Sequence, residues 1–164
     1  MDVYQFLEEA KKINLEWLKS RITEIIIENE LIFVDMLRAQ WESGENEAGK
    51  AVGRYKAITE NFYSLINPPS SGMPKKAGEP YNLIWSGELI RLTSIDLEVK
   101  DDELILIIDS SASSKNSLFS QIRKEGLVSE PDSIFGLQEV NLGKVVDMTE
   151  YDLIENFKKT LQIN

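Results

Sequence analysis

Hydrophobic side chains near the start of the chain recur three and four positions apart, the spacing of one face of an α-helix. The pattern covers residues 2–28, and charged side chains occupy the opposite face. The apolar positions are Val3, Phe6, Leu7, Ala10, Ile13, Trp17, Leu18, Ile22, Ile25 and Ile26. The pattern therefore predicts one long amphipathic helix, which either covers the core or packs partly on a neighbouring subunit.

Residues 31–41 combine two opposing signals. Leu31–Val34 favours a strand, whereas Met36–Gln40 favours a helix. A polar turn with two glycines follows at residues 42–49. The local pattern leaves the structure of residues 31–41 open.

Residues 67–80 contain four of the five prolines and are expected to form a loop. A structureless stretch of this length is either a solvated linker or an arm that orders against a partner. Two lysines give it a local positive charge, so we expect it to order across a subunit boundary, on an acidic face of an identical neighbour. The candidate interface residues in and near this loop are Pro68, Pro69, Pro74, Lys75, Lys76 and Trp85.

Polar and apolar residues alternate strictly from Ile95 to Lys100, which predicts a strand with one buried face. Asp101 and Asp102 form a turn into the apolar run Leu104–Ile108, so a β-hairpin is expected. The second strand is apolar on both faces, which predicts a central strand under a helix or one covered by another chain. Ile107→Asp is accordingly expected to unfold the domain.

The last part of the chain is expected to contain two helices. A short one begins at Ser113 or Ser114 and runs to about Lys124, residues 126–143 are loop-like, and a final helix spans residues 149–161. Asp147 or Thr149 would cap that helix. Together these elements predict a single α+β domain, residues 1–164, in which an antiparallel β-sheet packs with a long N-terminal helix and a C-terminal helix. The loop at 67–80 is its arm.

Composition removes several classes of chemistry. The 164 residues include no histidine and no cysteine, which excludes Ser-His triads, cysteine nucleophiles and thiolate metal sites. The net charge of −10 argues against binding to nucleic acid or to an anionic membrane. The N-terminus lacks the basic and apolar regions of a signal peptide, so we expect an unprocessed soluble protein made in a cytoplasm.

One short motif could hold a metal ion. Asp109, Ser111 and Ser113 form a D-x-S-x-S sequence directly after a hydrophobic strand, and that spacing resembles the magnesium site of von Willebrand A-type domains. Those domains need several further strand–helix units after the motif, and this chain is too short to supply them. A polar turn at the end of a strand is the alternative interpretation.

The order of several small motifs resembles a family of Bacteroidetes and crAss-like phage proteins of the head–tail connector, also described as neck or tail-completion proteins. The resemblance covers about residues 40–137. The residues that carry it are Gln40-Trp41-x-x-Gly44, Gly49, Tyr55, Gly78–Tyr81, Trp85–Leu89, Leu92–Ser94, Ser110-Ser111, Lys115 and Ile134–Leu137.

The resemblance implies a non-enzymatic structural protein of a bacteriophage virion that assembles into a twelve-fold or six-fold ring near the portal. The implied partners are further copies of the chain, the portal, and other neck or tail proteins, with no sequence-specific nucleic acid, no membrane and no cofactor. It implies no catalytic and no metal-binding residue. A generic oligomeric adaptor and a metal-binding domain using Asp109, Ser111 and Ser113 are the alternatives.

Overall fold

The computed structural model describes residues 2–58, 60–61, 75–82, 87–100, 103–113, 115–116, 120 and 134–163. These residues form N-terminal helices, one two-stranded antiparallel sheet and a C-terminal helix, which confirms the expected α+β class. The elements are α1 (Val3–Lys12), α2 (Leu15–Glu28), α3 (Glu30–Glu42), α5 (Glu88–Arg91), β1 (Thr93–Lys100), β2 (Glu103–Ser110) and α7 (Glu139–Leu161).

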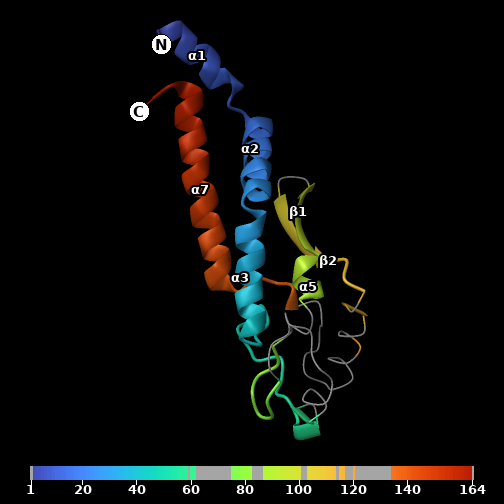
Figure 1. Ribbon diagram of the computed structural model, residues 1–164. Helices are drawn as coiled ribbons and strands as arrows, with labels where there is room; N and C mark the ends of the chain where they lie inside the picture. The colour runs from blue at the N-terminus through green and yellow to red at the C-terminus, as the bar shows by residue number, and fades with distance from the viewer. Residues whose placement is uncertain are drawn as a thin grey trace.

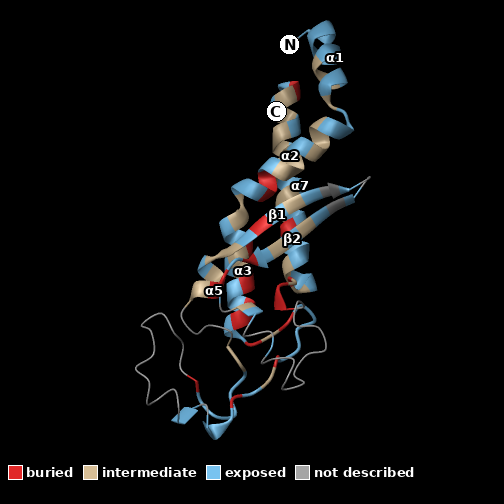
Figure 2. Ribbon diagram, turned by 90° about the vertical axis from the view of Figure 1, so that its right-hand side faces the viewer, coloured by how far each residue is buried: buried red, intermediate tan, exposed pale blue. Residues whose placement is uncertain are grey.

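The helices α2 and α3 follow one another nearly end to end and form the middle layer of the molecule (Figure 1). α7 packs along α2 on one side, and the β-hairpin contacts α2 and α3 through β1. Buried residues gather around α3 and the sheet, whereas α1 carries no buried residue (Figure 2). The sheet is therefore covered on one face by the N-terminal helices, and α7 lies beyond them.

The N-terminal helical region is interrupted, so the prediction of one continuous helix over residues 2–28 is wrong. α1 ends at Lys12, and Asn14 has the extended backbone of an N-cap residue. The Asn14 side-chain oxygen accepts a hydrogen bond of 2.9 Å from the backbone N–H of Trp17. A short polar side chain that satisfies this N–H starts a new helix, and here it outweighs the apolar pattern that runs through both segments.

The ambiguous segment at 31–41 is helical in the structure, as part of α3. Its deciding residues are Phe33, Leu37 and Trp41, which are four positions apart and have no exposed surface. A spacing of four places all three on one helix face, whereas a strand would place the charged Asp35 on the same face between Phe33 and Leu37. Burial of this face explains why the strand signal at Leu31–Val34 is overridden.

The predicted hairpin is confirmed, with Thr93 opposite Ser110 at one end and Lys100 opposite Glu103 at the other. On its inner face, Ile95 is buried and Leu97 and Leu106 pack against the core. The outer face is open. The side chains on that face are Asp96, Glu98, Ile105 and Ile107, and the two isoleucines are 36% and 39% exposed.

The second strand therefore does not lie centrally, contrary to the prediction from its apolar run. β2 pairs with β1 alone among the described strands, and helices cover only one face of this sheet. Side chains of a strand alternate between the two faces, so every second apolar residue of β2 points to the uncovered side.

Ile107→Asp is now expected to keep the protein folded, at a cost of about 1 kcal/mol in the free energy of unfolding, because this side chain already contacts water. The same change at Ile95, on the buried face of β1, should cost on the order of 4 kcal/mol because it buries an unpaired carboxylate. Urea unfolding followed by circular dichroism compares the two variants. Equal losses would mean that the outer face of the hairpin is covered in solution.

The C-terminal helix is longer than predicted. α7 begins at Glu139, ten residues before the expected start, and its N-cap is Gln138 instead of Asp147 or Thr149. The Thr149 hydroxyl lies inside the helix and donates to the Val145 carbonyl oxygen at 2.7 Å. The expected positions of Lys158 and Lys159 in the last turn are confirmed. Most of the short helix predicted at 113–124 lies outside the described residues.

Candidate functional site

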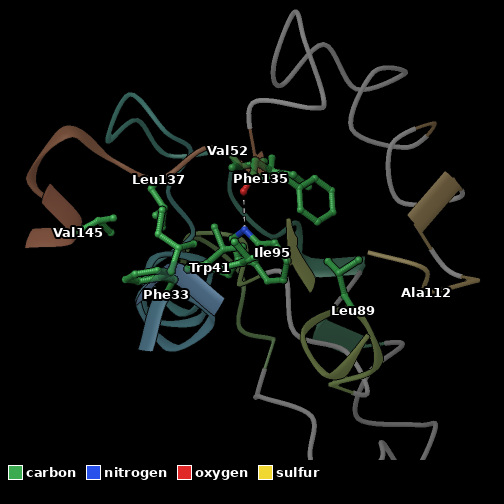
Figure 3. Close-up of a cluster of buried hydrophobic side chains, with 12 residues drawn as sticks. Phe33, Trp41, Val52, Leu89, Ile95, Ala112, Phe135, Leu137 and Val145 are labelled. Carbon is green, nitrogen blue, oxygen red and sulfur yellow. Dashed lines mark hydrogen bonds between the residues drawn. The ribbon is translucent and has the colours of Figure 1, made fainter. Parts of the chain in front are cut away.

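The motif residues at the end of α3 meet the segment that precedes α7. The Gln40 side chain donates to the Gly136 carbonyl oxygen at 2.9 Å and accepts from the Gln138 backbone N–H at 3.1 Å. The Trp41 indole N–H donates to the Ile134 carbonyl oxygen at 2.6 Å (Figure 3). We call this set of contacts, made by Gln40, Trp41 and residues 134–138, the α3 junction. It joins segments more than ninety residues apart.

Aromatic packing reinforces the α3 junction. Trp41 has no exposed surface, and its ring meets the Phe135 ring edge-on, with the ring centres 5.4 Å apart. Edge-to-face aromatic pairs add to the stabilisation that burial alone provides. The Gln138 side chain also donates to the Glu45 carboxylate at 2.7 Å, which holds the turn after α3 against the start of α7.

Gly44 marks a second close approach, between the turn after α3 and residues 78–82. Its φ angle is +72°, and a Cβ atom at this position would lie 2.2 Å from the Tyr81 carbonyl oxygen. The Gly44 carbonyl oxygen accepts from the Val52 N–H at 2.8 Å, and the Tyr81 N–H donates to Gly53 at 2.9 Å. Only glycine provides both this backbone conformation and this space.

Tyr55 anchors the end of the proline-rich loop to the same region. Its backbone N–H donates to Glu79 at 3.0 Å, and its carbonyl oxygen accepts from Gly78 at 2.9 Å. The Tyr55 and Tyr81 rings meet edge-on at 4.5 Å, and the Tyr55 hydroxyl donates to the Asn82 carbonyl oxygen at 2.6 Å. Residues 75–82 are therefore folded onto their own chain.

Lys75 is buried in this arrangement, with 4% of its surface exposed. Its ammonium group lies 5.4 Å from the centre of the Tyr55 ring and donates to the Asn82 carbonyl oxygen at 3.2 Å. Burial lowers the pKa of Lys75 to about 8, because an apolar environment disfavours the charged form. This lysine holds the loop end in place and does not present a charge to a neighbour.

These contacts within the chain weigh against an arm that reaches across a subunit boundary at residues 75–80, and the interface itself stays a prediction. Lys76 is exposed, but its carbonyl oxygen accepts a hydrogen bond from Glu79 in the turn that folds back. The remaining interface candidates, Pro68, Pro69, Pro74 and Trp85, lie outside the described residues. The sequence pattern contains no signal of the contacts that residues 75–82 make with Tyr55, so it predicted an arm that includes Lys75 and Lys76.

Asp109 of the D-x-S-x-S motif is engaged by a cation of the chain itself. The Lys115 ammonium group hydrogen-bonds to its carboxylate, and the Ser110 backbone N–H donates to it at 2.7 Å. Chiefly through Lys115, these bonds hold the pKa of the Asp109 carboxyl below its usual value. The Ser113 hydroxyl donates to the Glu88 carboxylate at 3.3 Å. These contacts favour the interpretation as a strand-ending turn.

The described residues contain no cluster of three or more acidic side chains that could hold a metal ion. A surface depression of about 470 Å³ lies between α3 and the start of α7. Its charged lining residues are Asp35, Glu45 and Lys144, and Met36 and Ala39 supply apolar surface. The depression is open to solvent and borders the α3 junction.

Sequence reasoning missed two contributors to these contacts, Gln138 and Asn82. Gln138 lay in a segment interpreted as a loop, where Glu139 directly after it was the one signal of a helix start. Asn82 follows Tyr81 and carries no local signal of its role, because both of its partners, Tyr55 and Lys75, come from earlier segments.

The described helices include none that is both long and apolar enough to cross a membrane. Comparison of the chain with protein-family models, with curated proteins and with solved structures gave no match.

Proposed function

We propose that this protein is a non-enzymatic structural component that forms a homo-oligomeric ring in the head–tail connector of a tailed bacteriophage. The motif resemblance supplies the connector assignment. The missing histidine and cysteine support a role without catalysis. The proposal of self-assembly rests on the exposure of α1, an amphipathic helix that buries none of its residues in the single chain.

α1 has the features of a helix built for a contact that one chain does not supply. Asp2 and Gln5 form a capping box at its start, so its N-terminus is well specified. Val3 and Tyr4 are 73% and 82% exposed, and Phe6 and Leu7 are also exposed. The helix touches only the distal part of the molecule, near the C-terminal end of α7 (Figure 1). A second subunit could cover its apolar side chains.

α7 offers a matching surface along its length. Val140, Tyr151 and Ile154 are exposed, and their spacings of eleven and three place them on one helix face. Exposed apolar residues that line up along an element mark contact surfaces more often than scattered ones do. An interface that joins α1 of one subunit to α7 of the next would be heterologous, and a heterologous interface forms a ring when the rotation between subunits closes.

Removal of residues 2–12 is expected to leave the fold intact and to abolish assembly, because the core lies entirely in later elements. The free energy of unfolding should change by less than about 1 kcal/mol. Size-exclusion chromatography with light scattering and negative-stain electron microscopy measure the mass and shape of the particles. Phe6→Ser with Leu7→Ser tests the same contact without shortening the chain.

The matched control is Glu8→Ser with Lys12→Ser, which alters exposed residues on the opposite side of the same helix without changing the net charge and should assemble as the unchanged protein does. Rings that persist without α1 would remove α1 from the interface. A monodisperse monomer at all concentrations, with no ring in the microscope, would overturn the proposed function in favour of a monomeric adaptor.

A further inference from the structure

The two edges of the hairpin differ in their surroundings. The Ile95 backbone N–H donates to the Glu30 carboxylate of α3 at 3.1 Å, so it is directed away from β2. In an antiparallel ladder, both residues of such a pair direct their backbone groups outward. Ile108 is the partner of Ile95, and Leu106 is the partner of Leu97, two positions on. Their backbone N–H and C=O groups therefore point outward from β2.

Within the part of the chain that the structure describes, the outer edge of β1 is occupied and that of β2 has no partner. Glu30 caps the β1 edge, and α2 and α3 pack against this strand. No described residue outside the hairpin forms a hydrogen bond with the backbone of Leu106 or Ile108. The described part of the hairpin crosses the helices obliquely (Figure 2). An open edge of this kind is a template for another strand.

The side chains on the outer face define what could add to this edge. Ile105 and Ile107 lie at the centre of β2, with Glu103 and Asp109 at its ends on the same face. Asp96 and Glu98 stand opposite the isoleucines on β1. Lys100 and Lys115 offset part of this charge, but neither Asp96 nor Glu98 forms an ion pair with a described residue. The face has an apolar centre bordered by four carboxylates and two lysines, with Asp109 paired to Lys115 and Glu103 opposite Lys100, so its border is acidic overall.

We propose that the free edge of β2 binds an extended segment of another protein, by strand addition, and that this segment carries apolar residues flanked by lysine or arginine. The backbone of Leu106 and Ile108 would supply the hydrogen bonds. Apolar side chains of the added strand would cover Ile105 and Ile107, and its basic residues would lie next to Glu103 and Asp109. This proposal does not depend on the connector assignment.

A second copy of the chain is the less favourable occupant. Antiparallel pairing of two β2 strands about Leu106 places Glu103 of each strand opposite Asp109 of the other. Like charges directly opposite one another in a sheet are destabilising. Each chain also carries a net charge of −10. Charge complementarity therefore selects a basic strand from a different protein.

Amide hydrogen exchange measured by NMR on the full chain tests the edge directly. In the free protein, the N–H groups of Leu106 and Ile108 should exchange fast, while those of Ile105 and Ile107, which face β1, should be protected. Addition of the capped peptide Lys-Thr-Val-Thr-Val-Thr-Lys should slow exchange at Leu106 and Ile108. The two lysines of this probe match the acidic ends of β2.

Two control peptides separate backbone pairing from charge. Replacement of the central threonine by proline removes the N–H that would face Leu106 and should abolish protection. Replacement of both lysines by glutamate should weaken binding by about tenfold or more. Raising the salt concentration from about 50 mM to about 300 mM should weaken binding of the lysine peptide, since the charges involved are exposed.

Ile107→Lys is the matched variant of the protein. It should fold, because Ile107 is already exposed, and should bind the lysine peptide about tenfold more weakly or not at all. Val146→Lys makes the same charge change on an exposed position of α7 and should leave binding unchanged. Slow exchange at Leu106 and Ile108 in the protein alone, increasing with its concentration, would assign the edge to a second copy. Unchanged exchange with the lysine peptide, or protection confined to other elements, would overturn the proposal.

Discussion

Trp41→Ala is expected to lower the free energy of unfolding by about 4 kcal/mol. The indole has no exposed surface, and its removal leaves a cavity between α3 and the segment before α7. It also leaves the Ile134 carbonyl oxygen without its hydrogen-bond donor. Urea unfolding followed by far-ultraviolet circular dichroism measures the loss, because this signal does not depend on the tryptophan that is removed.

Trp41→Phe separates packing from hydrogen bonding at the same position. It retains a six-membered ring and loses the five-membered part of the indole with its N–H, so a loss of about 1–2 kcal/mol, smaller than that of the alanine variant, is expected. Equal losses in the two variants would show that the bond to Ile134 dominates. A loss below about 1 kcal/mol in Trp41→Ala would contradict the α3 junction, because it would mean that residues 134–138 are not held against α3.

Gly44→Ala is expected to lower the free energy of unfolding by about 3 kcal/mol, because a Cβ atom at this position has two unfavourable effects. The added Cβ would lie 2.2 Å from the Tyr81 carbonyl oxygen, which belongs to the backbone and cannot rotate away. The φ angle of +72° adds the strain of a left-handed conformation. The expected result is a lower midpoint in thermal and urea unfolding, with separation of residues 78–82 from the turn after α3.

Gly78→Ala is the matched control for that variant. Gly78 also has a positive φ, of +84°, but no atom lies within 4 Å of the position of an added Cβ. Only the conformational strain applies, so the expected cost is about 1 kcal/mol. If the two alanine variants lose the same stability, the close approach of Gly44 to Tyr81 is not present in solution.

Local patterns predicted the elements whose signal lies within a few residues. The alternation at Ile95–Lys100 predicted β1, and the apolar run after it predicted β2. Helical spacing predicted apolar faces in both the N-terminal region and the C-terminal helix. Such patterns succeed because they record which side of an element is apolar, and that property belongs to the segment itself.

Local patterns failed where a single polar contact or a distant partner decides. Asn14 breaks the N-terminal helix by capping α2, although the apolar spacing continues across the break. Gln40 fixes Gln138 as the start of α7, ten residues before the expected helix. Lys75 is buried against Tyr55, although its position in a proline-rich loop with a second lysine indicated an exposed charge.

The sequence by itself determined the α+β class, the β-hairpin and the positions of the apolar helix faces. It also excluded chemistry that needs a histidine or cysteine side chain. Only the tertiary structure decided which of those apolar faces are covered. It buries Phe33 and Trp41 of α3, leaves Ile107 of β2 exposed and buries no residue of α1. The reason is that burial depends on how many layers the elements supply, and among the described elements the two-stranded sheet has helices on one side alone.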